Sequence, residues 1–178
     1  MESLMSIVVN TRVKCFMAES HASRAFLETT NAITFINEDM EVEYPDHRRT
    51  FYLIATINGI QIIRALIDTG ASLSLIALST LKAIGMSSKR ILGALVEITR
   101  FGGAIKSTKR YMKLAMRVGP IVALTRFHVI NQEVSYHILL GRPWLHKHRL
   151  IPSTYHQCVK GRLNGRPIRI SANPSPFQ

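Results

Sequence analysis

Two Asn-Gly dipeptides, Asn58-Gly59 and Asn164-Gly165, each lie between apolar-rich runs of the chain. Asn and Gly tolerate the positive φ angles of a type I′ turn, so this arrangement predicts β-hairpins. The first hairpin joins a strand over 51–57 to a strand over 60–67, and the second run is apolar enough to be largely buried. Such signals favour a fold that is mainly β.

Other turn residues divide the rest of the chain into short runs. Gly85 follows a helix-like segment at the position typical of a helix end, and Pro143 suits the first position of a helix. Pro167 lacks a ladder N–H, which predicts an edge strand. The expected strands cover 95–101, 106–118, 121–130, 135–140, 157–163 and 166–170, an apolar run covers 72–76, and the expected helices cover 77–84 and 143–148. Many short strands with one or two short helices predict a small closed or sandwich-like β fold.

The length of 178 residues permits one domain with a core and two flanking tails. Residues 1–46 lack periodicity and carry an acidic patch, so we expect a flanking arm or linker, with short strands at 6–9 and 33–36. The domain is expected to cover 47–170, followed by a disordered tail over 171–178.

Composition excludes several classes of protein. A hydrophobic content of 47% excludes disorder throughout, and the apolar runs are far too short to span a membrane. We expect no secretory signal, because the chain does not open with a basic stretch followed by an apolar one. The two cysteines do not form a disulfide framework, which favours a reducing compartment. We therefore expect an intracellular protein, cytoplasmic or nuclear.

Positive charge is concentrated in the second part of the chain. Residues 1–100 hold 10 basic and 10 acidic residues, whereas residues 101–178 hold 13 basic residues and only Glu133 as an acid. The whole formal charge of +12 therefore belongs to residues 101–178. A solvated basic surface explains this excess without a dedicated partner, and weak, non-specific nucleic-acid binding is the alternative.

The segment from Arg64 to Ser72 carries the clearest chemical signal. An apolar run ends directly in Asp68-Thr69-Gly70-Ala71. A carboxylate at the end of a core strand costs free energy unless it has a task or a partner. Gly70 lets backbone N–H groups approach the carboxylate, and Thr69 and Ser72 add hydroxyl groups. The structural alternative is an ordinary turn in which Asp68 bonds to its own backbone.

Two further motifs follow in order: Phe101-Gly102-Gly103, and Ile138-Leu139-Leu140-Gly141-Arg142. With the Asp68-Thr69-Gly70 segment, they resemble the retropepsin family, the single-lobe aspartic proteases of retroviruses and long-terminal-repeat retrotransposons. The resemblance covers about residues 51–160. Segment 143–148 and the long flanking arms resemble the gypsy-type retrotransposon branch.

The resemblance implies a closed retropepsin-like β-barrel and assigns a role to each motif. Asp68 is the expected catalytic carboxylate, and Thr69 is expected to form hydrogen bonds across a dimer. The backbone groups of Gly70 and Ala71 are expected to bind water and substrate. Phe101, Gly102 and Gly103 would form a flap over the substrate. Gly141 would allow close packing beneath the active-site loop, which Arg142 would brace, with Ser72 as further support.

Counting acids gives a separate argument. The chain has three aspartates, Asp39, Asp46 and Asp68, and the only later acids are Glu97 and Glu133. Aspartic protease chemistry needs two carboxylates that share one proton. The chain supplies one such residue, so we expect a homodimer. Its expected substrates are polypeptides, including its own polyprotein. If the element is active, the protein is expected within a virus-like particle.

Other kinds of site fit less well. His146, His148, His156 and Cys158 lack the spacing of a structural zinc site, and no nucleophilic triad or phosphate loop stands out. No metal or cofactor is expected. The competing hypothesis is a catalytically inactive retropepsin-like fragment of a degenerate retroelement, serving dimerisation or nucleic-acid binding.

Overall fold

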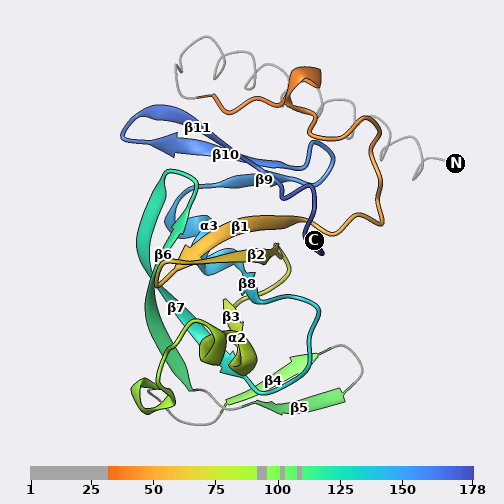
Figure 1. Cartoon of the computed structure of the whole chain (residues 1–178). Coiled ribbons are helices and arrows are strands. Elements are labelled where there is room, and N and C mark those ends of the chain that lie inside the picture. Colours follow the sequence, from red (N-terminus) through yellow and green to blue (C-terminus); the bar gives the residue numbers. More distant parts are fainter. Residues whose placement is uncertain (1–31, 92–95, 101–102, 108–109) are drawn as a thin grey trace, which may run out of the picture. The chain divides into compact units, whose positions relative to one another are not determined.

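The computed structural model describes residues 32–91, 96–100, 103–107 and 110–178 (Figure 1). The chain divides into two compact units, Met1–Thr34 and Phe35–Gln178, and every labelled element belongs to the second, which is described by itself. Its elements are η1 (Asn37–Asp39), β1 (Tyr52–Ile57), β2 (Ile60–Ile67), β3 (Leu75–Ala77), α2 (Leu78–Ala83), η2 (Ser88–Arg90), β4 (Val96–Arg100), β5 (Gly103–Ser107), β6 (Tyr111–Val118), β7 (Ile121–Ile130), β8 (Ile138–Leu140), α3 (Arg142–Lys147), β9 (Ile151–Ser153), β10 (Cys158–Leu163) and β11 (Arg166–Ser171).

Six strands close into a barrel in the order β1-β2-β8-β3-β7-β6 (Figure 1). The hairpins β1–β2 and β6–β7 are antiparallel, whereas β2 pairs with β8, and β3 with β7, in parallel. Closure leaves no open edge in this sheet. The prediction of a mainly β protein with a closed barrel and one or two short helices is confirmed, and the described residues contain two short α-helices.

Both Asn-Gly dipeptides form the expected turns. Asn58 and Gly59 have φ angles of 52° and 75°, and Asn164 and Gly165 have 51° and 76°. Positive φ at both central residues is the signature of a type I′ hairpin, which matches the twist of the flanking strands. The second hairpin, β10–β11, forms a three-stranded sheet with β9, and the strand that contains Pro167 lies at its edge as predicted.

Alternation along β6 shows how the barrel separates core from solvent. Met112, Leu114 and Met116 are buried, whereas Lys113 and Arg117 are exposed. This period of two is that of a strand with one face on the core. One apolar cluster joins the barrel to buried side chains of the two α-helices: Leu81 from α2, and Trp144 and Leu145 from α3.

Four local expectations differ from the structure. Residues 33–36 form no strand, because the backbone N–H of Ile36 donates to Asp39 Oδ2 and begins the η1 turn. The run over 106–118 is not one strand, since β5 ends at Ser107 and β6 begins at Tyr111. β8 starts at Ile138, where it first meets partner strands. β9 was not expected, since it is short and contains a proline. The strand expected at 6–9 lies outside the described residues.

Within the described ranges, no helix is both long and apolar enough to cross a lipid bilayer.

An ion-pair cluster fixes the segment around η1 to the β10–β11 sheet. Lys160 Nζ lies 2.6 Å from Asp39 Oδ2, and Arg169 Nε lies 3.6 Å from Asp39 Oδ1. Arg169 also pairs with Glu41, which accepts a hydrogen bond from the Ser171 hydroxyl. The hydrogen bond from Lys160 is the main reason that the pKa of Asp39 lies below its ordinary value of 3.8.

This cluster predicts an acid-sensitive contribution to stability. The pKa of Asp39 is lower in the folded chain than in the unfolded chain. Its ion pair therefore stabilises the fold fully at pH values above the ordinary pKa, and this stabilisation is lost as the pH falls through the pKa of the folded chain. Asp39→Asn is expected to lower the melting temperature at neutral pH, and this difference is expected to shrink below pH 3.8. Glu38→Gln, a matched change at an exposed neighbour, is the control. A difference between Asp39→Asn and wild type that is independent of pH would contradict the expectation.

Candidate active site

Asp68 directly follows β2, at the point where β2 and β8 end side by side. Ile67 pairs with Leu140 in the parallel ladder, and the N–H of Asp68 donates to the Leu140 carbonyl at 3.1 Å. The N–H of Ile67 donates to the Phe51 carbonyl at 3.0 Å. The barrel therefore fixes the backbone on which the carboxylate is carried, and the Asp68 side chain is half-buried.

The carboxylate folds back onto its own loop. Asp68 Oδ1 accepts a hydrogen bond from the N–H of Gly70 at 2.9 Å, and the Asp68 carbonyl accepts one from the N–H of Ala71 at 3.3 Å. A Cβ atom at Gly70 would lie 3.2 Å from Oδ1, a tight contact that the carboxylate would relieve only by shifting. The turn of the structural alternative is thus present, but it leaves Asp68 Oδ2 with no hydrogen-bond partner among the described residues.

Gly141 packs beneath this loop at a distance that admits no side chain. A Cβ atom there would lie 2.8 Å from the Ala71 carbonyl oxygen and closer still to that of Leu73. The N–H of Gly141 donates to Ser74 Oγ at 3.2 Å, inside the protein. The segment after β8 therefore lies directly against the loop after β2.

Arg142 joins the two segments by three hydrogen bonds. Its N–H donates to the Ala71 carbonyl at 2.9 Å, and Nη1 donates to the carbonyls of Thr69 and Gly70, each at 3.1 Å. Three consecutive carbonyls of the loop are therefore held by one residue. A loop fixed in this way keeps the Asp68 carboxylate in one position, as a catalytic group requires.

Ser74 is a supporting residue that the sequence reasoning missed. It is 2% exposed, its hydroxyl accepts from Gly141, and its carbonyl accepts the N–H of His128 at 2.8 Å. The available signal was a serine between Leu73 and Leu75 in an apolar run, because a buried hydroxyl needs a hydrogen-bond partner.

The remaining predicted site residues are placed as follows. Thr69 and Ser72 are exposed, and Ala71 is half-buried. Gly103 begins β5 and pairs with Arg100 of β4 across the β4–β5 hairpin. The flap residues Phe101 and Gly102 lie outside the described residues. The structure therefore brings Thr69, Gly70 and Ala71 together with Arg142, and pairs the two strands, β4 and β5, that flank Phe101 and Gly102 in the sequence.

Among the described residues of the chain, no other carboxylate pairs with Asp68. Asp39 and Glu41 pair with Lys160 and Arg169 in the cluster described above, and Asp46 pairs with Arg48. No hydrogen bond joins Asp68 to another acid among the described residues. A reaction that needs two carboxylates therefore needs one from elsewhere.

The residues weighed above as a metal site do not gather into one. His156 Nδ1 lies 2.7 Å from Ser153 Oγ, and its ring stacks on Phe35. Burial, with a smaller effect of Lys147, lowers the pKa of His148, and burial raises the pKa of the Cys158 thiol. In the part of the chain that the structure describes, no three His, Cys, Asp or Glu side chains form a group that could hold a metal ion.

Comparison with protein families gives one match. The sequence model of the family described as gag-polyprotein putative aspartyl protease matches residues 53–147, more than half of the chain. The matched span contains Asp68, Gly141 and Arg142. No curated protein matches the chain.

Solved structures provide a second comparison. The retroviral protease-like domain of Ddi1 from Leishmania major has a TM-score of 0.54 at 16% identity, over 75% of this chain and 98% of that domain. A retropepsin-like aspartic protease from Rickettsia conorii has a TM-score of 0.49 at 19% identity, over 63% and 83% of the two chains. EIAV protease complexed with the inhibitor HBY-793 has a TM-score of 0.47 at 22% identity, over 60% of this chain and 93% of that protease. At this identity, the likeness to the Leishmania domain shows the fold alone.

The close approach at Gly141 predicts a steric requirement for glycine. Gly141→Ala is expected to lower the free energy of unfolding by about 3 kcal/mol, because the new methyl group meets backbone carbonyls. Gly165→Ala is the control: it strains a positive φ but meets no atom within 4 Å, and costs about 1 kcal/mol. Urea unfolding measures both. Equal losses of unfolding free energy in the two variants would show that the close packing at Gly141 does not add to the stability of the fold.

Proposed function

Because this chain belongs to the family described as gag-polyprotein putative aspartyl protease, we propose that it is an aspartic endopeptidase whose catalytic group is Asp68. The observation that supports this most is that the loop after β2 is fixed by two parts of the fold. The barrel strands hold the backbone of Asp68, and Gly141 and Arg142 pack against and bond to the residues that follow it. A carboxylate that served only its own turn would not need this second segment.

The proposed enzyme is a homodimer. One chain offers a single suitable carboxylate, and hydrolysis of a peptide bond by this chemistry takes two that share a proton. A second copy, related by a two-fold axis, places an identical Asp68 opposite the first. The exposed Thr69 and the unpartnered Asp68 Oδ2 lie on the loop that such a partner would approach.

The two copies of Asp68 take different roles in the proposed mechanism. One, ionised, acts as a general base and takes a proton from a water molecule as its oxygen attacks the scissile carbonyl carbon. The other, protonated, donates its proton to the carbonyl oxygen. When the intermediate breaks, the C–N bond is cleaved and the amine leaves with a proton from the dyad.

The proposed substrate is an extended polypeptide, and in the family context the polyprotein of a retrotransposon. An extended peptide binds through backbone hydrogen bonds of the kind that join strands. The pair of strands β4 and β5 would cover the peptide and exclude water, with Phe101, Gly102 and Gly103 as the predicted flap residues.

Asp68→Asn tests the proposed catalytic role. Cleavage of a peptide mixture, followed by mass spectrometry, is expected to fall by a factor of about 10² to 10⁴. The fold is expected to survive, because the carboxamide oxygen still accepts the Gly70 N–H. Asp46→Asn makes the same chemical change at an exposed site and is expected to stay active. Cleavage by Asp68→Asn at the wild-type rate, or cleavage insensitive to a pepstatin-type inhibitor, would refute the proposal.

Mixing wild-type and Asp68→Asn chains tests the sharing of the site. In an equimolar mixture that exchanges subunits, about one quarter of the dimers carry two intact carboxylates. Peptidase activity is therefore expected at about a quarter of that of the same total concentration of wild type. If each chain worked alone, the mixture would keep about half. Mixing with Asp46→Asn instead should leave activity unchanged.

A further inference from the structure

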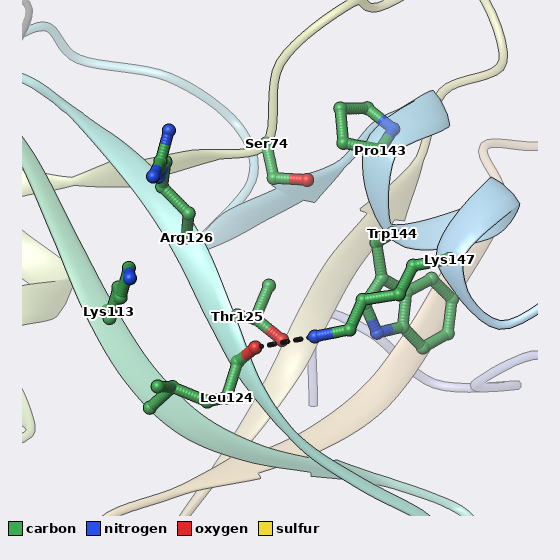
Figure 2. Close-up of a pocket in the computed structure, with 8 residues that line it drawn as sticks. All are labelled: Ser74, Lys113, Leu124, Thr125, Arg126, Pro143, Trp144 and Lys147. Carbon is green, nitrogen blue, oxygen red and sulfur yellow. Dashed lines mark hydrogen bonds between the residues drawn. The ribbon is translucent and has the colours of Figure 1, made fainter.

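A pocket of about 340 Å³ is lined by residues of β6, β7 and α3, together with Ser74 just before β3 (Figure 2). Three of its lining residues are cations from three different elements: Lys113 from β6, Arg126 from β7 and Lys147 from α3. The proposed peptidase chemistry uses none of them. Their convergence on one hollow needs a separate explanation.

Lys113 and Arg126 stand directly opposite each other in the β6–β7 ladder. Both side chains are exposed on the outer face of the sheet. Like charges at directly opposed positions repel and destabilise a sheet. In the described part of the chain, no carboxylate lies within ion-pair distance of Lys113, Arg126 or Lys147. A bound anion would remove this repulsion.

The cations are held in place but retain donors for a ligand. Lys147 Nζ donates to the Leu124 carbonyl at 3.0 Å, which leaves two of its three N–H groups (Figure 2). The guanidinium carbon of Arg126 lies 4.6 Å from the centre of the Tyr111 ring. A guanidinium stacked on a ring keeps its N–H groups at the edge, where they can bond to an anion.

One buried polar atom of a residue that lines the pocket has no partner. Trp144 is 2% exposed, and its indole Nε1 has no hydrogen-bond partner among the described residues. In Figure 2 this nitrogen is on the side of the ring that faces Lys147 and β7. A buried donor without an acceptor costs free energy, which an oxygen atom or a water molecule that reaches Nε1 would offset.

We propose that this pocket binds the phosphodiester backbone of a nucleic acid through Lys113, Arg126 and Lys147. Arg117 extends the basic face: it is exposed on the same side of β6, four residues from Lys113 and thus about 13 Å away. A chain of closely spaced phosphates meets several such cations at once, whereas a single carboxylate meets one or two.

The surroundings also favour a nucleic acid. Residues 101–178 carry 13 basic residues against one acid, a field that attracts polyanions over a distance. Val122 and Leu124 are 62% and 56% exposed on β7, next to the cations. They offer apolar surface against which a sugar or base can pack.

Binding of a fluorescent 20-nucleotide oligothymidylate, measured by anisotropy at several salt concentrations, tests the proposal. The full chain is expected to bind, with a log–log salt slope of about −0.7 for each phosphate contact. Lys113→Gln/Arg126→Gln is expected to bind about tenfold more weakly, with a slope shallower by about 1.4. The melting temperature should not fall, because the substitution removes a repulsion.

Lys82→Gln/Arg90→Gln is the matched control, since it removes the same charge from exposed sites on α2 and η2. It should bind nearly as wild type does. Equal losses of affinity in the two variants would show that binding depends on net charge alone, and this would overturn the proposal. The absence of any binding by the wild-type chain would overturn it as well. Binding of a poly-glutamate peptide in place of the oligonucleotide would assign the pocket to acidic polypeptides and also overturn it. No peptide cleavage enters the assay, so its failure is distinct from failure of the proposed peptidase.

Discussion

The site depends on one close approach, that of the Gly141 backbone to the carbonyls of Ala71 and Leu73. This contact lets the segment after β8 lie flat beneath the loop after β2, and Arg142 can then reach three carbonyls of that loop. Any larger residue would push the two segments apart. The position of the Asp68 carboxylate is therefore set by a residue 73 positions away that has no side chain.

The sequence predicted most of the barrel because its signals are local. An Asn-Gly dipeptide sets both φ angles of a hairpin turn, so the end of β1 and the start of β2 follow from Asn58-Gly59. In the same way, β7 begins directly after Gly119-Pro120. The errors lie where the structure depends on distant partners. β8 starts at Ile138 because β2 and β3 are there to pair with it, and β9 exists because β10 does. No local pattern carries that information.

The same division applies to the site. Asp68, Gly141 and Arg142 were named from short motifs, and the structure brings them together, whereas Ser74 was missed because its role appears only when β3 and β8 meet. The contact of Asp39 with Lys160 was equally hidden, since the two residues are separated by 121 positions. The roles assigned to Thr69 and Ser72 stay predictions, because both are exposed in the single chain.

Two features of this domain carry the two proposals: the half-buried Asp68 on the loop after β2, and the basic pocket lined by Lys113, Arg126 and Lys147. The central claim concerns the first, that one chain holds half of a catalytic site. Calorimetric titration of the purified full chain with a pepstatin-type inhibitor tests it most directly. The account predicts saturation at one inhibitor for two chains, and no binding by Asp68→Asn. Saturation at one inhibitor per chain, at concentrations where the protein is monomeric, would contradict it.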